Sequence, residues 1–180
     1  MKKTAFILLL ALFSVSTIVL SQGIEKTIPP VYRNQVGVQL NPYLNHGSLD
    51  GLVYGLRYGY KLSKPITIGA EVSGIFPAFN YYIKHYNYKV GLFARYTILT
   101  EKRIQPFIEA AHFFAHTYIP QAGTYPERTM NQFGLYVAPG LTLYTRNRKY
   151  SMDLYYKLYI HPSDMYYHEN TISYKFNFHF

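Results

Sequence analysis

Apolar and polar residues alternate along most of the chain with a period of two. In the segment 52–62, leucines and tyrosines at the even positions alternate with Val, Gly, Arg and Lys at the odd positions. The segment 172–180 has Ile, Tyr and Phe at its even positions and Ser, Lys, Asn and His between them. Such alternation is typical of strands with one apolar face. Six further segments follow the same rule: 35–43, 66–76, 86–99, 104–115, 132–144 and 149–160. The sequence therefore predicts eight strands.

The segment 104–115 is the least regular of the eight. Its apolar face carries Pro106, which cannot donate a hydrogen bond to a neighbouring strand, and His112, which is polar. The register of this fifth strand is therefore the hardest to assign from the sequence.

The connections between the predicted strands alternate in length. Three short ones, at 63–65, 100–103 and 145–148, interleave with longer ones at 44–50, 77–85, 116–131 and 161–170. Membrane barrels keep short turns at the periplasmic end and longer loops outside. We therefore expect an all-β fold, an eight-stranded antiparallel transmembrane β-barrel with up-and-down (meander) order and a periplasmic N-terminus.

The residues on the two faces indicate what surrounds the barrel. A water-soluble barrel has the same period but turns its apolar face inward around a ligand. Here the less apolar face carries glycines and single charges, which suit a narrow lumen, and many of the 21 Tyr and 12 Phe fall at strand ends. Aromatic girdles form at the two membrane interfaces. The predicted girdle residues are Tyr58, Tyr60, Tyr86, Tyr88, Tyr96, Tyr144, Tyr150, Phe178 and Phe180.

The N-terminal residues have the features of a secretory signal peptide. Two lysines follow Met1, and an apolar run extends from Ala5 to Leu20. A retained anchor helix is the alternative, although the run is short for a membrane span. We expect three parts: a cleaved signal peptide at 1–21, a short periplasmic segment at 22–34 and an outer-membrane barrel domain at 35–180.

The formal net charge of +9 raises the question of an anionic partner. The basic residues are scattered singly among aromatics, which argues against nucleic acid and favours outer-membrane lipids and lipopolysaccharide. There is no Cys, so disulfides are excluded. The seven histidines show no tight ligand spacing, so we predict neither a metal site nor a cofactor.

Four stretches carry a resemblance to a known family. They are Lys-Val-Gly-Leu-Phe-Ala-Arg-Tyr at 89–96, Gln-Pro-Phe-Ile-Glu-Ala at 105–110, Gly-Leu-Tyr-Val-Ala-Pro-Gly-Leu at 134–141 and the last strand, which ends at Phe180. With them, residues 31–180 resemble the OmpA/OmpX-type small outer-membrane β-barrels. The resemblance implies a location in the outer membrane of a Gram-negative type of cell. It also implies that the outer-membrane insertion machinery reads the C-terminal strand by strand addition.

A belt of charged residues is predicted to line the lumen. Its members are Arg57, Glu71, Arg95, Glu109, Asp153, Lys157 and Lys175. The first four lie near the middle of successive strands, all at inward positions, with alternating sign. Such a belt would pair its charges in a lumen too narrow for bulk water. Bulky aromatics at 93, 107, 113, 136, 155 and 159 share this face and favour a plug. A path for ions or protons is the alternative.

The segment 161–164, His-Pro-Ser-Asp, is similar to the His-x-Ser-Asn motif of the lipid A 3-O-deacylase barrels. The similarity implies a lipid acyl hydrolase with His161 as base, Ser163 as nucleophile and Glu169 as orienting acid. The segment departs from the motif at Asp164 and in the spacing of its acid, and strict alternation points His161 inward. Pro, Ser and Asp are also common turn residues, and we favour that interpretation.

These patterns favour a non-enzymatic barrel that supports membrane integrity or presents its loops for binding or adhesion. The segment 116–131 is the longest predicted loop, and it carries Tyr118, Tyr125 and Arg128. Tyr and Arg recur in binding hot spots, and loops on a rigid scaffold often carry function. The sequence does not identify an extracellular ligand. A narrow pore is a further alternative.

Overall fold

The computed structural model describes residues 32–45, 48–77, 86–121, 126–160 and 172–180. Its strands are β1 (Asn34–Asn45), β2 (Ser48–Lys61), β3 (Ile66–Pro77), β4 (Tyr86–Thr97), β5 (Ile104–Ile119), β6 (Arg128–Tyr144), β7 (Tyr150–Tyr156), β8 (Leu158–Ile160) and β9 (Ile172–His179). No helix in these ranges is long and apolar enough to cross a membrane. The predicted signal peptide and nearly all of the segment 22–34 lie outside the described residues.

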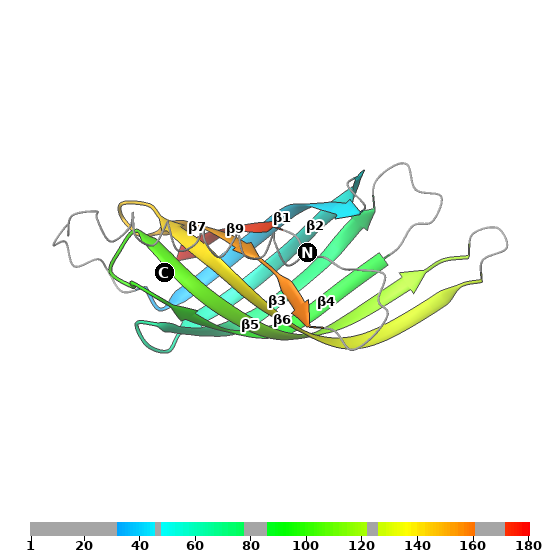
Figure 1. The fold of residues 1–180 in the computed structure, drawn as a ribbon, viewed down its shortest axis with the longest axis horizontal. Helices are drawn as coiled ribbons and strands as arrows, with labels where there is room; N and C mark the ends of the chain where they lie inside the picture. Colours follow the sequence, from blue (N-terminus) through cyan, green and yellow to red (C-terminus); the bar gives the residue numbers. More distant parts are fainter. Residues whose placement is uncertain (1–31, 46–47, 78–85, 122–125, 161–171) are drawn as a thin grey trace, which may run out of the picture.

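The strands form one closed antiparallel barrel (Figure 1). The order runs from β5 through β4, β3, β2, β1, β9 and β7 to β6, and β6 pairs with β5 again. β1 pairs with both β2 and β9, so the first and last strands lie side by side. β7 and β8 both pair with β6 and are separated only by Lys157, so they act as one wall strand. The predicted eight-stranded up-and-down barrel is confirmed.

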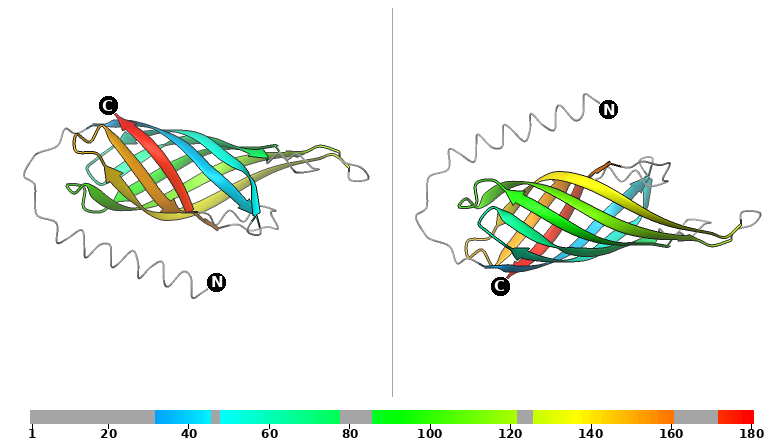
Figure 2. Two further views of the ribbon diagram at one scale, coloured as in Figure 1. Left: turned by 90° about the horizontal axis from the view of Figure 1, so that it is seen from above. Right: turned by 90° about the horizontal axis from the view of Figure 1, so that it is seen from below.

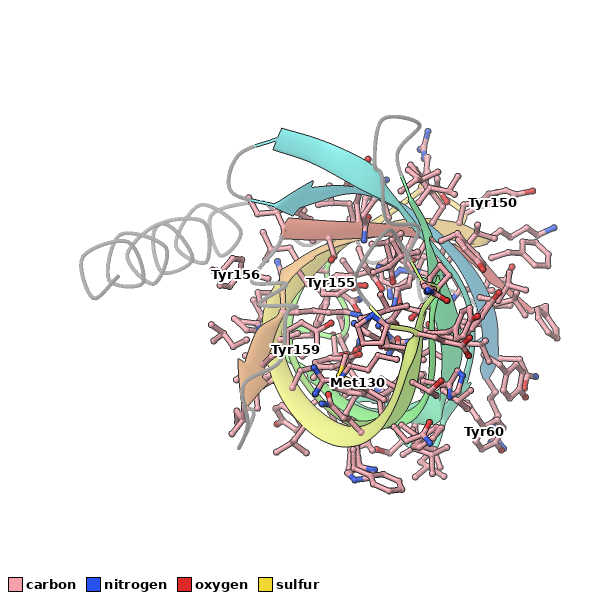
Figure 3. All side chains as sticks on the ribbon, turned by 90° about the vertical axis from the view of Figure 1, so that its right-hand side faces the viewer. Tyr60, Met130, Tyr150, Tyr155, Tyr156 and Tyr159 are labelled. Atoms are coloured by element: carbon pink, nitrogen blue, oxygen red, sulfur yellow. The ribbon has the colours of Figure 1, made fainter. Side chains whose placement is uncertain are left out.

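Burial alternates along the strands, and it places polar residues inside the barrel. Among the described residues, twenty buried side chains are polar or charged and eight are hydrophobic. Large apolar side chains cover the outside, with Leu92 70% and Phe133 65% exposed. Looking along the barrel, Figure 3 shows Tyr155 and Tyr159 inside the ring of strands and Tyr150 outside it. A water-soluble barrel would have the opposite distribution, so that alternative is wrong and the outer wall requires lipid.

The fifth strand keeps its register through both awkward residues. Pro106 and His112 lie outward, and the carbonyl of Pro106 accepts a hydrogen bond from the amide of Ile98 at 2.7 Å. His112 is paired with Leu92 on β4 and Leu135 on β6. Its ring stacks on that of Phe133 with 5.8 Å between centroids. The strand therefore tolerates these two residues on its lipid-facing side.

Glycines make room for the inward aromatic rings. Gly69 is the register partner of Phe93, and a Cβ at Gly69 would lie only 2.5 Å from that ring. Gly134 is the partner of Phe113, where the corresponding distance is 2.3 Å. Each ring thus lies over the backbone of the next strand, which only glycine permits. This packing carries large rings into a narrow lumen.

The β5–β6 hairpin projects beyond the rest of the barrel (Figure 2). These two strands have 16 and 17 residues, against 12 each in β3 and β4. They stay paired out to Ile119 and Arg128. The prediction of one long loop over 116–131 was therefore wrong, and only 120–127 connect the strands. Inward Thr117 continues the period of two here, but its polar neighbours conceal the pattern in the sequence.

Candidate functional site

The middle of the lumen is built around Glu109 on β5, which is 0% exposed. Arg57 on β2 reaches it across the lumen, with Nη1 2.8 Å from Oε1 and Nη2 2.5 Å from Oε2. Arg95 on β4 donates from Nε to Oε2 at 2.9 Å. One carboxylate therefore receives two guanidinium groups, one of them bidentate, which is the strongest hydrogen-bonding geometry for this pair of groups.

Arg95 extends this network to the opposite wall. Its Nη2 lies 2.8 Å from Oδ2 of Asp153 on β7. The hydroxyl of Thr142 on β6 donates to the other oxygen of Asp153 at 2.8 Å. A continuous chain of ion pairs thus runs from β2 through β5 and β4 to β7, with every member buried.

Glu71 on β3 forms the second centre of the network. The hydroxyl of Tyr136 donates to Glu71 at 2.9 Å and also lies 3.0 Å from Glu109, so it joins the two centres. The ammonium groups of Lys175 and Lys157 lie 3.3 and 3.5 Å from the Glu71 carboxylate. Arg57 is farther away, at 3.8 Å. The closest cations of Glu71 are therefore two lysines and not the arginine of the neighbouring strand.

Aromatic rings pack against the cations of the belt. The guanidinium carbon of Arg57 lies 3.1 Å from the ring centroid of Phe93, and that of Arg95 lies 3.7 Å from the centroid of Phe107. Lys175 lies over Tyr155 at 5.0 Å. Cations are attracted to ring faces, most strongly where water is excluded. Charges and rings together fill the middle of the lumen and hold each other in place.

This arrangement suits structural support better than chemistry. Each charge of the belt is engaged with an opposite charge. In the part of the chain that the structure describes, no three His, Cys, Asp or Glu side chains are grouped to hold a metal ion. The candidate catalytic residues His161, Ser163 and Glu169 lie outside the described residues.

The predicted girdle residues lie mainly at one end of the barrel, which we call the turn rim. The turn rim comprises residue 33 just before β1, residue 61 at the end of β2, and the turns at 62–65, 98–103 and 145–149. Five girdle residues are exposed near it: Tyr58, Tyr96, Tyr150, Phe178 and Phe180. Tyr60 is half-buried, and the side chain of Tyr86 lies outside the described residues. Tyr144 does not belong to the girdle, because it faces inward, with its ring 5.1 Å from that of buried His179.

Arg148 joins two turns of the turn rim. Its guanidinium donates to the carbonyl oxygens of Thr100 at 3.1 Å, Glu101 at 2.5 Å and Lys102 at 3.2 Å. Partial burial lowers the pKa of Arg148, which nevertheless stays charged at neutral pH. Sequence reasoning missed this residue, because a single arginine in a turn carries no pattern. Its left-handed backbone, with φ of 55°, is visible only in the structure.

The projecting hairpin carries the predicted contact residues. Arg128 is exposed and Tyr118 is half-buried, while Tyr125 lies outside the described residues. His116 and Asn131 face each other across the two strands, with Nδ1 and Oδ1 2.6 Å apart. The base of the projecting part is therefore fixed by side chains as well as by its backbone.

No family model and no curated protein matches the chain. Solved structures that resemble it include three barrels. Neisserial surface protein A (NspA) has 16% sequence identity and a TM-score of 0.59, and the match covers 83% of this chain and 96% of that chain. The N-terminal β-barrel domain of Pseudomonas aeruginosa OprF has 13% identity and a TM-score of 0.55, with coverage of 83% of this chain and 100% of that chain. The Yersinia pestis outer membrane protein Ail in a nanodisc has 11% identity and a TM-score of 0.52, again with coverage of 83% and 100%. An apolar outer wall on this fold belongs in an outer membrane. The chain therefore has the fold of the small outer-membrane β-barrels, as its resemblance to the OmpA/OmpX type predicted.

Proposed function

We propose that the protein is a non-enzymatic outer-membrane barrel that presents the end of its β5–β6 hairpin, with the adjoining loops, for binding outside the cell. The observation that carries the proposal is the continued pairing of β5 and β6 out to Ile119 and Arg128. Inside the wall, the side-chain amide of Asn87 on β4 donates to Thr117 on β5 at 2.9 Å. A surface held by paired strands loses little conformational entropy on binding.

The buried ion pairs in the lumen favour a role in binding or structural support over a role in transport. A permeating ion would have to separate buried pairs such as Arg57–Glu109, and separating a buried pair costs several kcal/mol. The belt also supports a contribution to membrane integrity, because it stabilises the wall from inside. A narrow pore remains the alternative, and conductance measurements in planar bilayers address it.

The test removes the hairpin tip and leaves the barrel intact. Residues 120–127 are replaced by Asn-Gly, which closes a two-residue hairpin turn between Ile119 and Arg128. Cells expressing the intact or the shortened protein are then compared for attachment to host-cell monolayers and to immobilised serum and matrix proteins. We expect attachment to fall to the level of cells without the protein, while the shift in gel mobility on heating shows that the barrel is folded.

Glu101→Gln at the turn rim is the control, since it changes an exposed side chain at the opposite end of the barrel. It should leave attachment unchanged. Equal attachment by the intact and shortened proteins would show that the hairpin tip is not the binding surface. The role in membrane integrity would then be examined by comparing detergent sensitivity of cells with and without the protein.

A further inference from the structure

The turn rim concentrates the positive charge of the molecule. Eight basic side chains lie there: Arg33, Lys61, Lys64, Lys102, Arg103, Arg146, Arg148 and Lys149. Glu101 is the one acidic side chain in these fully described turns and flanking positions. At the other end of the barrel, the described residues that connect or flank β5 and β6, at 120–121 and 126–128, carry one acid, Glu127, and one cation, Arg128. In the part of the chain that the structure describes, the turn rim therefore has a large excess of positive charge, whereas the charges of the hairpin end balance.

The structure also holds two of the cation-bearing turns close together. Because Arg148 binds three carbonyl groups of the turn 98–103, it draws that turn against the turn 145–149. Burial lowers the pKa of Arg148, and the positive charge of Arg103 in the adjoining turn lowers it further. Glu101 pairs with Lys64 at 3.5 Å, but both side chains are more than 70% exposed, so this pair screens the rim only weakly.

The rim lies at the depth of a membrane surface. Directly along the strands from it, Tyr58, Tyr96 and Tyr150 point outward and are 46%, 56% and 54% exposed. Exposed aromatic side chains of a membrane protein settle at the level of the lipid headgroups. Basic residues at that level attract anionic headgroups. The rim cations are also spread over several turns around the barrel, which suits a ring of lipids better than one bound molecule.

We propose that the turn rim binds the headgroup phosphates of anionic phospholipids, such as phosphatidylglycerol, in the leaflet that it faces. Arg146 and Lys149, both exposed on the turn between β6 and β7, are the principal contacts. Arg148 is a positioning residue, which holds the adjoining turn beside them. This inference concerns the end of the barrel opposite the hairpin and does not depend on the proposed function.

The test measures lipid binding by the full-length protein purified from membranes. The protein is exchanged into detergent and titrated with phosphatidylglycerol or phosphatidylethanolamine of identical acyl chains, and bound lipids are counted by native mass spectrometry. We expect tighter binding of phosphatidylglycerol. The double variant Arg146→Gln/Lys149→Gln should weaken the binding of phosphatidylglycerol more than tenfold, because each cation removed weakens it about fivefold. The binding of phosphatidylethanolamine should not change.

Two single variants provide a matched comparison. Arg146→Gln should weaken phosphatidylglycerol binding, whereas Arg128→Gln, which removes an exposed cation from the hairpin end, should not. Arg146→Lys should restore most of the affinity, since the charge is kept. The shift in gel mobility on heating shows that each variant is folded.

Other results would overturn the proposal. Equal binding of the two lipids by the intact protein would do so, as would an equal effect of Arg146→Gln and Arg128→Gln. The rim could instead recognise the cell wall, which is tested by sedimenting the detergent-solubilised protein with purified peptidoglycan. If the double variant lost sedimentation with peptidoglycan and kept its preference for phosphatidylglycerol, the rim would be a cell-wall contact and the lipid proposal would be wrong.

Discussion

Glu109→Gln removes the negative charge at the centre of the lumen without changing the shape of the side chain. Glu109 accepts two hydrogen bonds from Arg57 and one from Arg95, and the Tyr136 hydroxyl lies 3.0 Å from it. After the change Arg95 keeps Asp153 at 2.8 Å, but the nearest remaining carboxylate of Arg57 is that of Glu71, at 3.8 Å. One buried guanidinium is thus left without a close counter-charge.

The size of the effect follows from this geometry. Breaking a buried ion pair by removing one partner costs about 3–5 kcal/mol. The Gln side chain still offers one oxygen as an acceptor, so the lower end, about 3 kcal/mol, is expected. The belt contains four cations and three acids, so the substitution also increases its excess of positive charge. Glu71→Gln should destabilise for the same reason, because Lys157 and Lys175 lose their shared carboxylate.

The assay is reversible urea unfolding in phospholipid vesicles, followed by circular dichroism and by gel mobility without heating. Glu101→Gln is the chemically matched control. Its side chain is 81% exposed, so its free energy of unfolding should hardly change. The double variant Arg57→Gln/Glu109→Gln should recover part of the loss, since both members of the pair are then neutral. If Glu109→Gln unfolded at the same urea concentration as the unchanged protein, the belt would not stabilise the barrel and the reasoning would fail.

Four other measurements test separate features of the structure. Gly134→Val should lower the free energy of unfolding by about 1–3 kcal/mol in the same urea assay, because its Cβ would meet the ring of Phe113. Arg148→Met should speed hydrogen exchange in the turn 98–103, since three carbonyls lose their donor, at a cost of about 1 kcal/mol. His112→Leu should raise the free energy of unfolding in vesicles by roughly 1 kcal/mol, because an exposed polar ring on the lipid side is replaced by an apolar group. A lower free energy of unfolding would mean that lipid does not cover this face. The intact protein should give no discrete channel openings in a planar bilayer, and regular openings would favour the pore.

The strand count and the inward face could be read from the sequence because a period of two fixes both. The strand ends were less certain. β4 was expected to reach residue 99 but ends at Thr97, since Leu99 turns the chain with a left-handed φ of 56°. The segment 149–160 was expected to be continuous, and it is divided at Lys157, whose ammonium group reaches toward Glu71. Such local departures depend on tertiary contacts, which alternation does not encode.

Only part of the pairing within the belt could be read from the sequence: Arg95 and Glu109, register partners on neighbouring strands, are hydrogen-bonded at 2.9 Å. Alternating signs on successive strands suggested pairing along the wall, and Arg57 is indeed the register partner of Glu71. The shortest contacts of Arg57 nevertheless run across the lumen to Glu109. Whether two long side chains can meet across a barrel depends on its diameter, which follows from strand number and tilt together. Period and charge alone do not supply that distance.

Stability and permeability oppose each other in a lumen of this kind. The groups that would have to move to open a path, such as Arg57, Glu109 and Arg95, are the groups whose ion pairs join opposite walls. A wider lumen would therefore require the loss of buried pairs, at a cost comparable to a large part of a small domain's stability. We therefore expect the barrel to act through its lipid-facing wall and its two ends. The ends differ in shape and in charge, so a partner of one end has no reason to bind the other, and variants at the hairpin and at the turn rim should affect separate functions.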